Sequence, residues 1–518
     1  MPARERLPAE RMINMKKAVF AAVLAAAAAV LTACTADTET VQDTSGAVIT
    51  FAEESVTGSG TGWQAEGTAV TIDSSGTYTV SGNCSDGTIK IKKGVEDVTL
   101  VLDGLTLESG DTAPITCGKS STVTIVAREG TVNSLSDTEY NNDDEYPENT
   151  SAENAVIKCK DGSNVTISGT GTLNITAKGK NGIKSGTADD ETGSSASLTV
   201  DGPEINISAP VNDGINAESL LSILNGSVTV AAGDDGIHCD YELNIGAEGT
   251  DGPEINITEC YEGMEGANLN IYSGDITITA SDDCLNAANG DLAGYDFTLD
   301  IAGGTLNMYT TDGDGIDSNG TLDISGGTVI VWTANRADNQ PLDADGEITI
   351  TGGTVLAGGG STGMGMNLET TQPYVLFGGS MFSGGPGESG GLTVEQGAIE
   401  IRDASGSAAY SGEAPCAGMY VFFSSGQLKS GESYELVSNG EFLAAAEAST
   451  ESLAGAFSGG FGAPGGMGTP PDMGERPADA APPDMGELPE NGTPPEKPEG
   501  GTPPEMGSAP PEPPAASE

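Results

Sequence analysis

The stretch "GDDGIHCD" at residues 233–240 recurs in altered form along the chain and sets its register. Related turns are "VNDGINAE" at 211–218, "SDDCLNAA" at 281–288 and "GDGIDSNG" at 313–320. Each places acidic residues just before one apolar residue. These apolar positions, with further turns of the same kind, are Ile115, Val156, Ile183, Ile215, Ile237, Met264, Leu285, Ile316, Leu342 and Met366. After a first step that contains an insert, they lie 21 to 32 residues apart, the length of one solenoid coil with variable loops.

Two further alternating runs recur in each unit. One has the form "LNI" at 243–245 and "LDI" at 322–324, and the other follows a glycine turn, as in "SVTV" at 227–230 and "TVIV" at 328–331. Short strands separated by Gly, Asn and Asp bends predict an all-β protein, a parallel β-helix of about ten or more coils over residues 61–403. The right-handed sense follows from the general rule for parallel crossovers.

The two ends of the chain differ from this middle region. Residues 1–34 predict an export signal, because "MKKAVFAAVLAAAAAVLTAC" at 15–34 has lysines, a short apolar run and then small residues. "LTAC" at 31–34 resembles the lipobox of bacterial lipoproteins, which implies a lipid on Cys34; a plain secretion signal is the alternative. We expect a flexible linker at 35–60, C-terminal capping strands at 404–454 and a disordered Pro/Gly-rich acidic tail at 455–518.

The charge of the chain excludes two classes of partner. The 518 residues include 77 acidic and 20 basic side chains, a formal net charge of −57. Nucleic acid and bare anionic membrane would be repelled. We therefore expect an exported monomer at the cell surface, anchored by acyl chains to the outer face of the cytoplasmic membrane.

Stacking of the repeated turns brings acidic residues of successive coils within about 4.8 Å of one another. Carboxylates this close repel unless they are protonated or neutralised, and oxygen-rich sites of this kind suit Ca²⁺. The alternative is that Asp-Gly and Asn-Gly serve only the bends, which does not explain the doublets at 234–235 and 282–283. A second position, one residue after the apolar one, adds Asn216, His238, Glu265, Asn286, Asp317 and Asp343. The predicted calcium ligands are Asp213, Asp234, Asp235, Asp282, Asp283, Asp312, Asp314 and Asp317.

A column of outward residues is predicted on another face. Thr279, Tyr309 and Trp332 occupy equivalent places in "ITITA", "LNMYT" and "VIVWT". Aromatic rings displayed on a flat β surface suit sugar rings, so Tyr309 and Trp332 are candidate carbohydrate-binding residues. Isolated surface aromatics are the alternative.

Together these residues resemble a known family. The "DGI-[ND]-[AS]" turns, coils such as "LDISGGTVIV" at 322–331 and the closing "FFSSGQLKSGESYELV" at 422–437 are similar to bacterial carbohydrate-binding β-helix proteins, which are similar in fold to calcium-dependent pectate lyases. The resemblance implies a right-handed β-helix, displayed outside the cell, that binds calcium and plant-type polysaccharide such as cellulose or polygalacturonate.

Cleavage of a polyuronate requires a base to remove a proton, and the sequence offers few. Between Lys184 and Arg402 there is no lysine, and the only arginine is Arg336, so Lys184 and Arg336 are the weak catalytic candidates. The expectation is a non-catalytic, calcium-dependent carbohydrate-binding protein. A calcium-dependent lyase acting on polyuronate and a structural or adhesive envelope protein without glycan binding are the alternatives.

Overall fold

The computed structural model describes residues 46–292, 294–334, 339–360, 367–378 and 392–453. These residues form strands, turns and bends and contain no helix, which confirms the all-β prediction. The predicted export signal with Cys34 and the C-terminal tail lie outside the described residues. None of the described segments is a helix with the length and apolar character needed to cross a bilayer.

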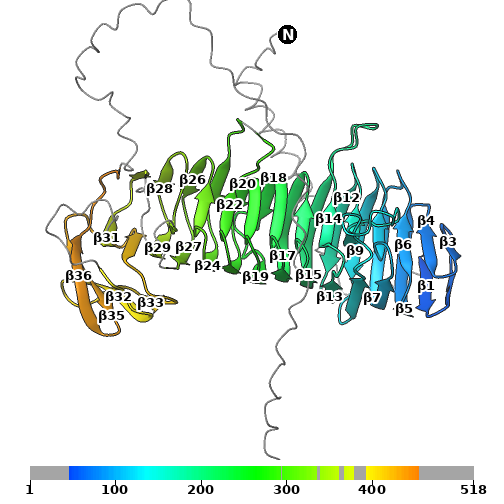
Figure 1. Ribbon diagram of the computed structural model, residues 1–518, viewed down its shortest axis with the longest axis horizontal. Helices are drawn as coiled ribbons and strands as arrows, with labels where there is room; N and C mark the ends of the chain where they lie inside the picture. The colour runs from blue at the N-terminus through cyan, green and yellow to red at the C-terminus, as the bar shows by residue number, and fades with distance from the viewer. Residues whose placement is uncertain (1–45, 293, 335–338, 361–366, 379–391, 454–518) are drawn as a thin grey trace, which may run out of the picture. The chain divides into compact units, whose positions relative to one another are not determined.

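Most strands join one large sheet through parallel pairing between equivalent strands of successive repeat units (Figure 1). Three such ladders run along the repeats. Ladder 1, which carries the acidic turns, comprises β4 (Ala69–Ile72), β6 (Thr88–Ile91), β8 (Ile115–Cys117), β11 (Ala155–Cys159), β14 (Asn181–Ser185), β16 (Ile215–Ala217), β18 (Ile237–Ile245), β20 (Met264–Ile271), β22 (Leu285–Ala287) and β25 (Ile316–Ser318).

Ladder 2 contains the "LxI" runs and includes the second halves of β18 and β20. Its other strands are β1 (Ala47–Ala52), β5 (Gly76–Cys84), β7 (Val98–Ser109), β9 (Thr122–Ala127), β12 (Asn164–Gly169), β15 (Ser197–Ala209), β17 (Leu220–Ala232), β23 (Thr298–Ile301), β26 (Thr321–Ile324), β28 (Ile348–Ile350) and β30 (Leu368–Thr370).

Ladder 3 contains the runs that follow the glycine turns, including the second halves of β5, β7, β15 and β17. Its other strands are β10 (Val132–Asp137), β13 (Thr172–Thr176), β19 (Glu254–Glu259), β21 (Asp275–Ala280), β24 (Thr305–Thr310), β27 (Thr328–Thr333) and β29 (Thr354–Gly359).

The strands form because apolar and polar residues alternate, so that one face of each strand is buried. In β7, Val98, Leu100 and Leu102 are fully buried and the residues between them are partly exposed. The corner within β17 requires Gly226, which has a φ of 96° and whose missing Cβ would lie 2.4 Å from the Pro203 carbonyl oxygen. Apolar side chains of successive repeat units, which we call coils, therefore stack into one continuous core.

The N-terminal end of the sheet corrects the predicted linker. Residues 47–59 form β1 and β2 (Ser55–Ser59), an antiparallel hairpin in which β1 also pairs in parallel with β5. Ile49 and Phe51 are buried in the core, with exposed fractions of 0% and 2%. The second half of the 35–60 linker prediction is therefore wrong, because a short alternating run was hidden among Thr, Ser and Glu. The strand β3 (Trp63–Glu66) pairs antiparallel with β4.

At the other end, antiparallel strands meet the last coils. β34 (Tyr420–Ser425) pairs antiparallel with β29 and with β31 (Tyr374–Gly378), so the edge of β29 does not stay open. A separate antiparallel sheet contains β33 (Ala408–Ala414), β32 (Gly397–Asp403), β35 (Ser433–Ser438) and β36 (Glu441–Glu447). The predicted boundary between residues 403 and 404 assigned β32 to the repeats. In the structure β32 belongs to this terminal sheet, so the terminal sheet begins before residue 404.

Candidate metal site

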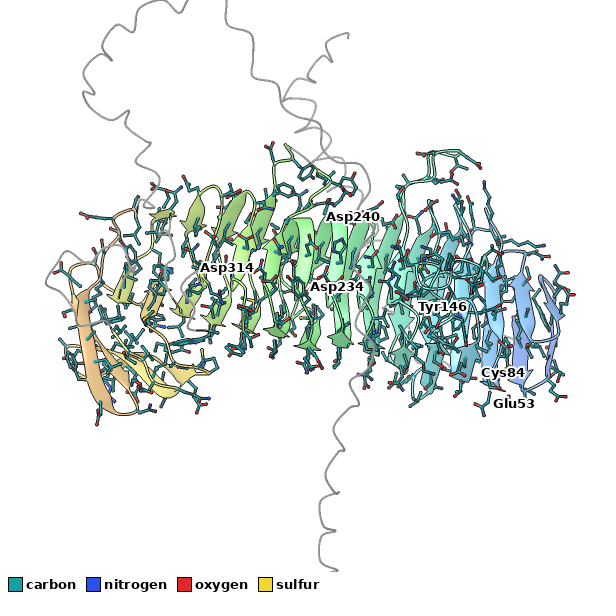
Figure 2. All side chains as sticks on the ribbon, in the orientation of Figure 1. Glu53, Cys84, Tyr146, Asp234, Asp240 and Asp314 are labelled. Atoms are coloured by element: carbon teal, nitrogen blue, oxygen red, sulfur yellow. The ribbon has the colours of Figure 1, made fainter. Side chains whose placement is uncertain are left out.

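The acidic turns lie just before the ladder 1 strands, where successive coils approach closely. The backbone N–H of Gly236 donates to the carbonyl oxygen of Glu262 on the next coil at 2.9 Å. A Cβ on Gly236 would lie 2.7 Å from the Gly263 carbonyl oxygen. The position of Gly236 therefore favours glycine, because the next coil leaves no room for a side chain. The acidic residue of the turn comes directly before this glycine. Figure 2 labels Asp234, Asp240 and Asp314 along this part of the chain.

The residues before the glycine position form what we call the acid column: Asp213, Asp235, Glu262, Asp283 and Asp314. Several of these carboxylates accept a backbone N–H from the equivalent residue one coil further along. Asp213 Oδ1 accepts from Asp235 at 3.2 Å, and Asp283 Oδ1 accepts from Asp314 at 2.6 Å. These acids thus help to close the bends, which is the role that the alternative interpretation of the sequence assigned to them.

The residues that follow the apolar position form the strand column: Asn216, His238, Glu265, Asn286 and Asp317, in register on neighbouring strands. Where this column carries an amide, the amide donates a hydrogen bond to the acid column. Asn216 Nδ2 donates to Asp213 Oδ2 at 2.6 Å, and Asn286 Nδ2 donates to Glu262 Oε2 at 3.0 Å.

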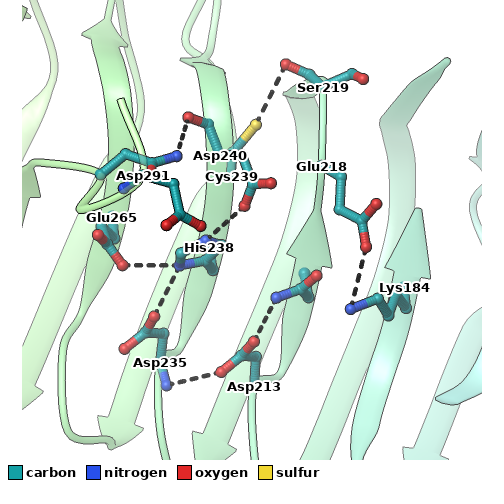
Figure 3. A network of polar contacts seen from close by, with 12 residues as sticks. Lys184, Asp213, Glu218, Ser219, Asp235, His238, Cys239, Asp240, Glu265 and Asp291 are labelled. Atoms are coloured by element: carbon teal, nitrogen blue, oxygen red, sulfur yellow. Dashed lines mark hydrogen bonds and ion pairs between the residues drawn. The ribbon is translucent and has the colours of Figure 1, made fainter. Parts of the chain in front are cut away.

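His238 fills the same role as a cation (Figure 3). Its Nδ1 lies 2.9 Å from Asp235 Oδ2 and 2.8 Å from Glu265 Oε2, and its Nε2 lies 3.0 Å from Asp240 Oδ1. Burial by itself lowers the pKa of His238, but hydrogen bonds to the three carboxylates outweigh burial and raise it far above its ordinary value. The imidazolium is therefore a built-in counter-ion for this part of the column.

The strand column supplies no side-chain hydrogen-bond donor at the turn of Asp314, because its residue there is the carboxylate of Asp317. One oxygen from each of Asp314, Asp317 and Asp343 lies within 4.8 Å of the others. Among the described residues no lysine, arginine or histidine forms an ion pair with these three carboxylates. This cluster, which we call the triacid site, thus brings three carboxylates together without an ion-pair partner among the described residues.

Burial and mutual repulsion make the ionised form of this region unfavourable without a counter-ion. Burial, with added repulsion from neighbouring carboxylates, raises the pKa of Asp314 to about 7 and that of Asp317 to about 6. Burial raises the pKa of Asp283, one coil away, to about 8, and Asp317 and Asp314 contribute. At neutral pH Asp283 is then largely protonated and Asp314 partly protonated, and a bound cation would displace these protons.

Two neutral oxygens beside the triacid site have no hydrogen-bond partner. They are Oδ1 of Asn286, in register with Asp317, and Oε1 of Gln340, whose backbone N–H donates to Asp314 Oδ1 at 2.6 Å. Both side chains are buried, with exposed fractions of 8% and 5%. Buried oxygens normally find a partner, and Ca²⁺ takes six to eight oxygen ligands of mixed carboxylate and amide type. The residues present therefore fit calcium.

The structure brings together only some of the predicted ligands. Asp314 and Asp317 gather with Asp343, the charges of Asp314 and Asp317 help to raise the pKa of Asp283, and the charge of Asp282 helps to raise that of Asp314. The hydroxyl of Tyr261 donates to the Asp282 carboxylate, which raises the pKa of Tyr261 to about 12.

The remaining predicted ligands are not among the three carboxylates of the triacid site. Asp213 and Asp235 are engaged by Asn216 and His238 several coils away, and Asp234 and Asp312 are exposed. Asn286 and Gln340 were not predicted as ligands, because a neutral amide adds no charge to the sequence pattern.

The basic candidates separate as well. Lys184 pairs with Glu218 through Nζ and Oε1, 3.3 Å apart, and Arg336 lies outside the described residues. Lys158 was missed, although it is the register neighbour of Lys184. The sequence pattern predicted Val156 at the recurring apolar position, whereas Ile157 pairs with Ile115 and Ile183. This error of one residue placed Lys158 outside the predicted strand column.

The predicted aromatic column is in register, but it is not displayed. Thr279, Tyr309 and Trp332 stack on ladder 3 as expected. Trp332 is only 1% exposed and packs in a second core with residues such as Leu356 and Ile399, and Tyr309 packs against the same cluster. The expectation of an open sugar-binding platform at Trp332 is therefore wrong, because the C-terminal sheet covers this face.

Comparison with known proteins identifies the family. The model of the carbohydrate-binding domain-containing protein family matches residues 66–363, more than half of the chain. The chain belongs to this family.

A curated relative from Acetivibrio thermocellus, described as a carbohydrate-binding domain-containing protein, is 35% identical over 132 residues. This match covers 25% of the present chain and 44% of the relative, so the chain spans less than half of that protein. A solved structure of a polysaccharide lyase-like protein from C. thermocellum, a gadolinium derivative, is 22% identical with a TM-score of 0.32, covering 63% of this chain and 94% of the other.

Proposed function

We propose that this protein is a non-catalytic, calcium-dependent carbohydrate-binding protein of the cell surface that recognises acidic plant-type polysaccharide such as polygalacturonate. The observation that carries the proposal is the triacid site. In the coils of Asp213, Asp235 and Glu262 an amide or an imidazolium donates a hydrogen bond to the acid, and the coil of Asp314 offers a third carboxylate instead.

Calcium at the triacid site would explain how a negatively charged protein can bind an acidic polysaccharide. A chain with a formal charge of −57 repels a polyuronate at long range. A bound divalent cation offsets two of the three negative charges of the site and can accept oxygens from a further carboxylate, because Ca²⁺ tolerates variable coordination. Asp314, Asp317 and Asp343 would hold the ion, with Asn286 and Gln340 as neutral ligands, and the sugar carboxylate would complete its shell.

Cellulose is the neutral alternative as ligand, and the geometry favours it less. A neutral chain needs exposed aromatic faces, whereas Trp332 is buried beneath the C-terminal sheet. The exposed Tyr261 instead lies beside the acid column through its hydrogen bond to Asp282. An acidic sugar uses the calcium and the tyrosine together.

Binding rather than cleavage is proposed because the described basic residues lie away from the triacid site. In the lyase alternative, Lys184 would remove a proton, but its ammonium is held by Glu218 and it occupies a strand five register positions from Asp317. Calcium that only stabilises the coils, in a structural envelope protein, is the third possibility.

The finer fold and the location complete the proposal. Three parallel ladders per repeat support a β-helix, and the general rule for parallel crossovers makes it right-handed. Export and a lipid on Cys34 would display the domain on the outer face of the cytoplasmic membrane, as a monomer that contacts the membrane through acyl chains. Metabolic labelling with a fatty acid, compared between the natural chain and Cys34→Ser, tests the anchor.

Retention of the full chain on immobilised polygalacturonate, measured in calcium and in chelator, tests the function. The proposal expects retention in calcium that is lost in chelator and restored by added calcium. Absence of retention in calcium would refute it. Formation of unsaturated products, followed by ultraviolet absorbance in the same samples, would support the lyase alternative, and calcium-dependent stability without retention would support the structural role.

A further inference from the structure

Ladder 1 changes sign along its length. Going from the triacid site toward the N-terminus, the strand column continues from Asn216 to Lys184, Lys158, Thr116 and Lys90. Neighbouring positions in a parallel ladder are about 4.8 Å apart, so Lys158 lies roughly 29 Å from Asp317 along the same face. The column is therefore acidic at one end and basic at the other.

Lys158 differs from the other lysines of these coils. Lys184 pairs with Glu218, and Lys160 pairs with Glu153 at 2.6 Å. Both acids act on Lys158 only at longer range, and no described carboxylate forms an ion pair with it. Burial, together with the charge of Lys184, lowers the pKa of Lys158. A half-buried ammonium beside a second ammonium is stabilised by an anion that contacts both.

An inserted loop that carries two aromatic side chains contacts the coil of Lys184. Tyr140 and Tyr146 lie in the insert between β10 and β11, with ring centroids 4.8 Å apart, and Tyr140 is 51% exposed. Asp144 of the same loop pairs with Lys180, and the charge of Lys184 also contributes to lowering the pKa of Asp144. The loop therefore lies next to the coil of Lys184, and Tyr146 is labelled in Figure 2.

We propose that Lys158 and Lys184, together with the loop of Tyr140 and Tyr146, form a second carbohydrate contact that binds a uronate carboxylate directly, without calcium. This inference rests on the proposed binding of an acidic polysaccharide. Each ammonium has three donors, so Lys184 can keep Glu218 while it shares a sugar carboxylate with Lys158. The tyrosine rings offer an apolar surface to the sugar ring.

The two contacts act on one polymer. A chain held by calcium at the triacid site presents further carboxylates along ladder 1, and the second contact then forms within the complex, so the overall affinity exceeds that of either contact alone. The basic end of the column thus explains how an acidic protein could hold a polymer beyond its metal site.

The test compares the full chain with Lys158→Gln, Lys158→Arg and the control Lys429→Gln. Lys429 is an exposed lysine that pairs only with Glu432, three residues away near the C-terminal sheet. Affinity for polygalacturonate is measured in saturating calcium, and calcium affinity is measured without glycan. Loss of one charge-assisted contact predicts about tenfold weaker glycan binding for K158Q, with K158R near the natural value and K429Q unchanged. Calcium affinity should be the same in all four proteins.

Each outcome decides the inference. Unchanged glycan affinity in K158Q, or an equal loss in K429Q, would overturn the second contact and leave the calcium-dependent function standing. If the natural chain fails to bind polygalacturonate in calcium, the proposed function and this inference both fall. Thermal unfolding verifies that the variants are folded, and Lys158→Met, which keeps the aliphatic stem, replaces K158Q if that variant unfolds.

Discussion

His238 and Glu265 occupy equivalent positions on neighbouring strands of ladder 1, and the Nδ1 of the ring lies 2.8 Å from the Glu265 carboxylate. Asp317 lies three positions beyond His238 in the same column, and carboxylates of Asp314 and Asp343 lie close to it. One column thus contains a coil with its own cation and a coil whose three carboxylates have no ion-pair partner among the described residues. This difference generates the predictions that follow.

Replacing His238 by leucine should destabilise the fold in calcium-containing buffer by about 3 kcal/mol, because it leaves buried carboxylates without their counter-ion. His238→Asn should cost less, since Asn216 and Asn286 perform the same task with an amide. Urea unfolding of the three proteins provides the measurement. A leucine variant as stable as the natural chain would show that His238 is not the counter-ion.

Replacing Asp317 by asparagine should have opposite effects with and without metal. In chelator the variant should be more stable than the natural chain, because one repelling carboxylate is gone. In calcium it should bind the ion at least about tenfold more weakly, because a charged ligand is lost. Calorimetric titration and urea unfolding measure the two effects.

The matched control for this variant is Asp323→Asn, on the neighbouring ladder 2 strand β26, which should change neither quantity substantially. If Asp317→Asn lowered stability in chelator, the triacid site would be an internally satisfied network instead of a metal site.

The free energy of unfolding should depend less on pH in calcium than in chelator. The pKa values of Asp283, Asp314 and Asp317, raised by burial to about 8, 7 and 6, exceed their ordinary value of about 3.9. Between the ordinary and the raised pKa values, these three carboxyl groups hold protons in the folded chain that they have released in the unfolded chain. Stability in chelator should therefore fall as pH rises from about 4 to 8. Calcium replaces these protons, so the fall should be smaller in calcium.

Calcium affinity should also rise over the upper part of this range, because the ligands must lose protons to bind the ion. Thermal unfolding at a series of pH values, in calcium and in chelator, tests both statements. Curves that run parallel in the two buffers would show that these carboxylates are not linked to the metal.

The sequence predicted the ladder positions better than their environments. The recurring apolar residue located Ile183, Ile215 and Ile237 in register, because a buried position must be filled by an apolar side chain on every coil. It missed at Val156, since "AVIK" has two adjacent apolar residues and only pairing with Ile115 and Ile183 selects Ile157. A shift of one residue reverses the faces of a strand, and Lys158 was lost with it.

Burial by distant parts of the chain could not be predicted in this way. Trp332 is at an outward position of its strand, and the sequence pattern alone makes it exposed. Its cover comes from the terminal sheet, including Ile399 and Leu436, whose docking depends on tertiary contacts and not on local period. Similarly, the neutral ligand candidates Asn286 and Gln340 became visible only when the structure showed that their oxygens are buried and unpartnered.

Replacing Trp332 by alanine should therefore affect stability and not sugar binding. The side chain is 1% exposed, and truncation of a buried aromatic typically costs about 3–5 kcal/mol. Tyr241→Ala, at a side chain that is 44% exposed, is the matched aromatic control and should cost far less. Urea unfolding and polygalacturonate affinity are measured on the same samples, at a temperature where both variants are folded. A folded Trp332→Ala protein with normal stability and weakened glycan binding would restore Trp332 as a sugar-binding residue and require the C-terminal sheet to move away from ladder 3.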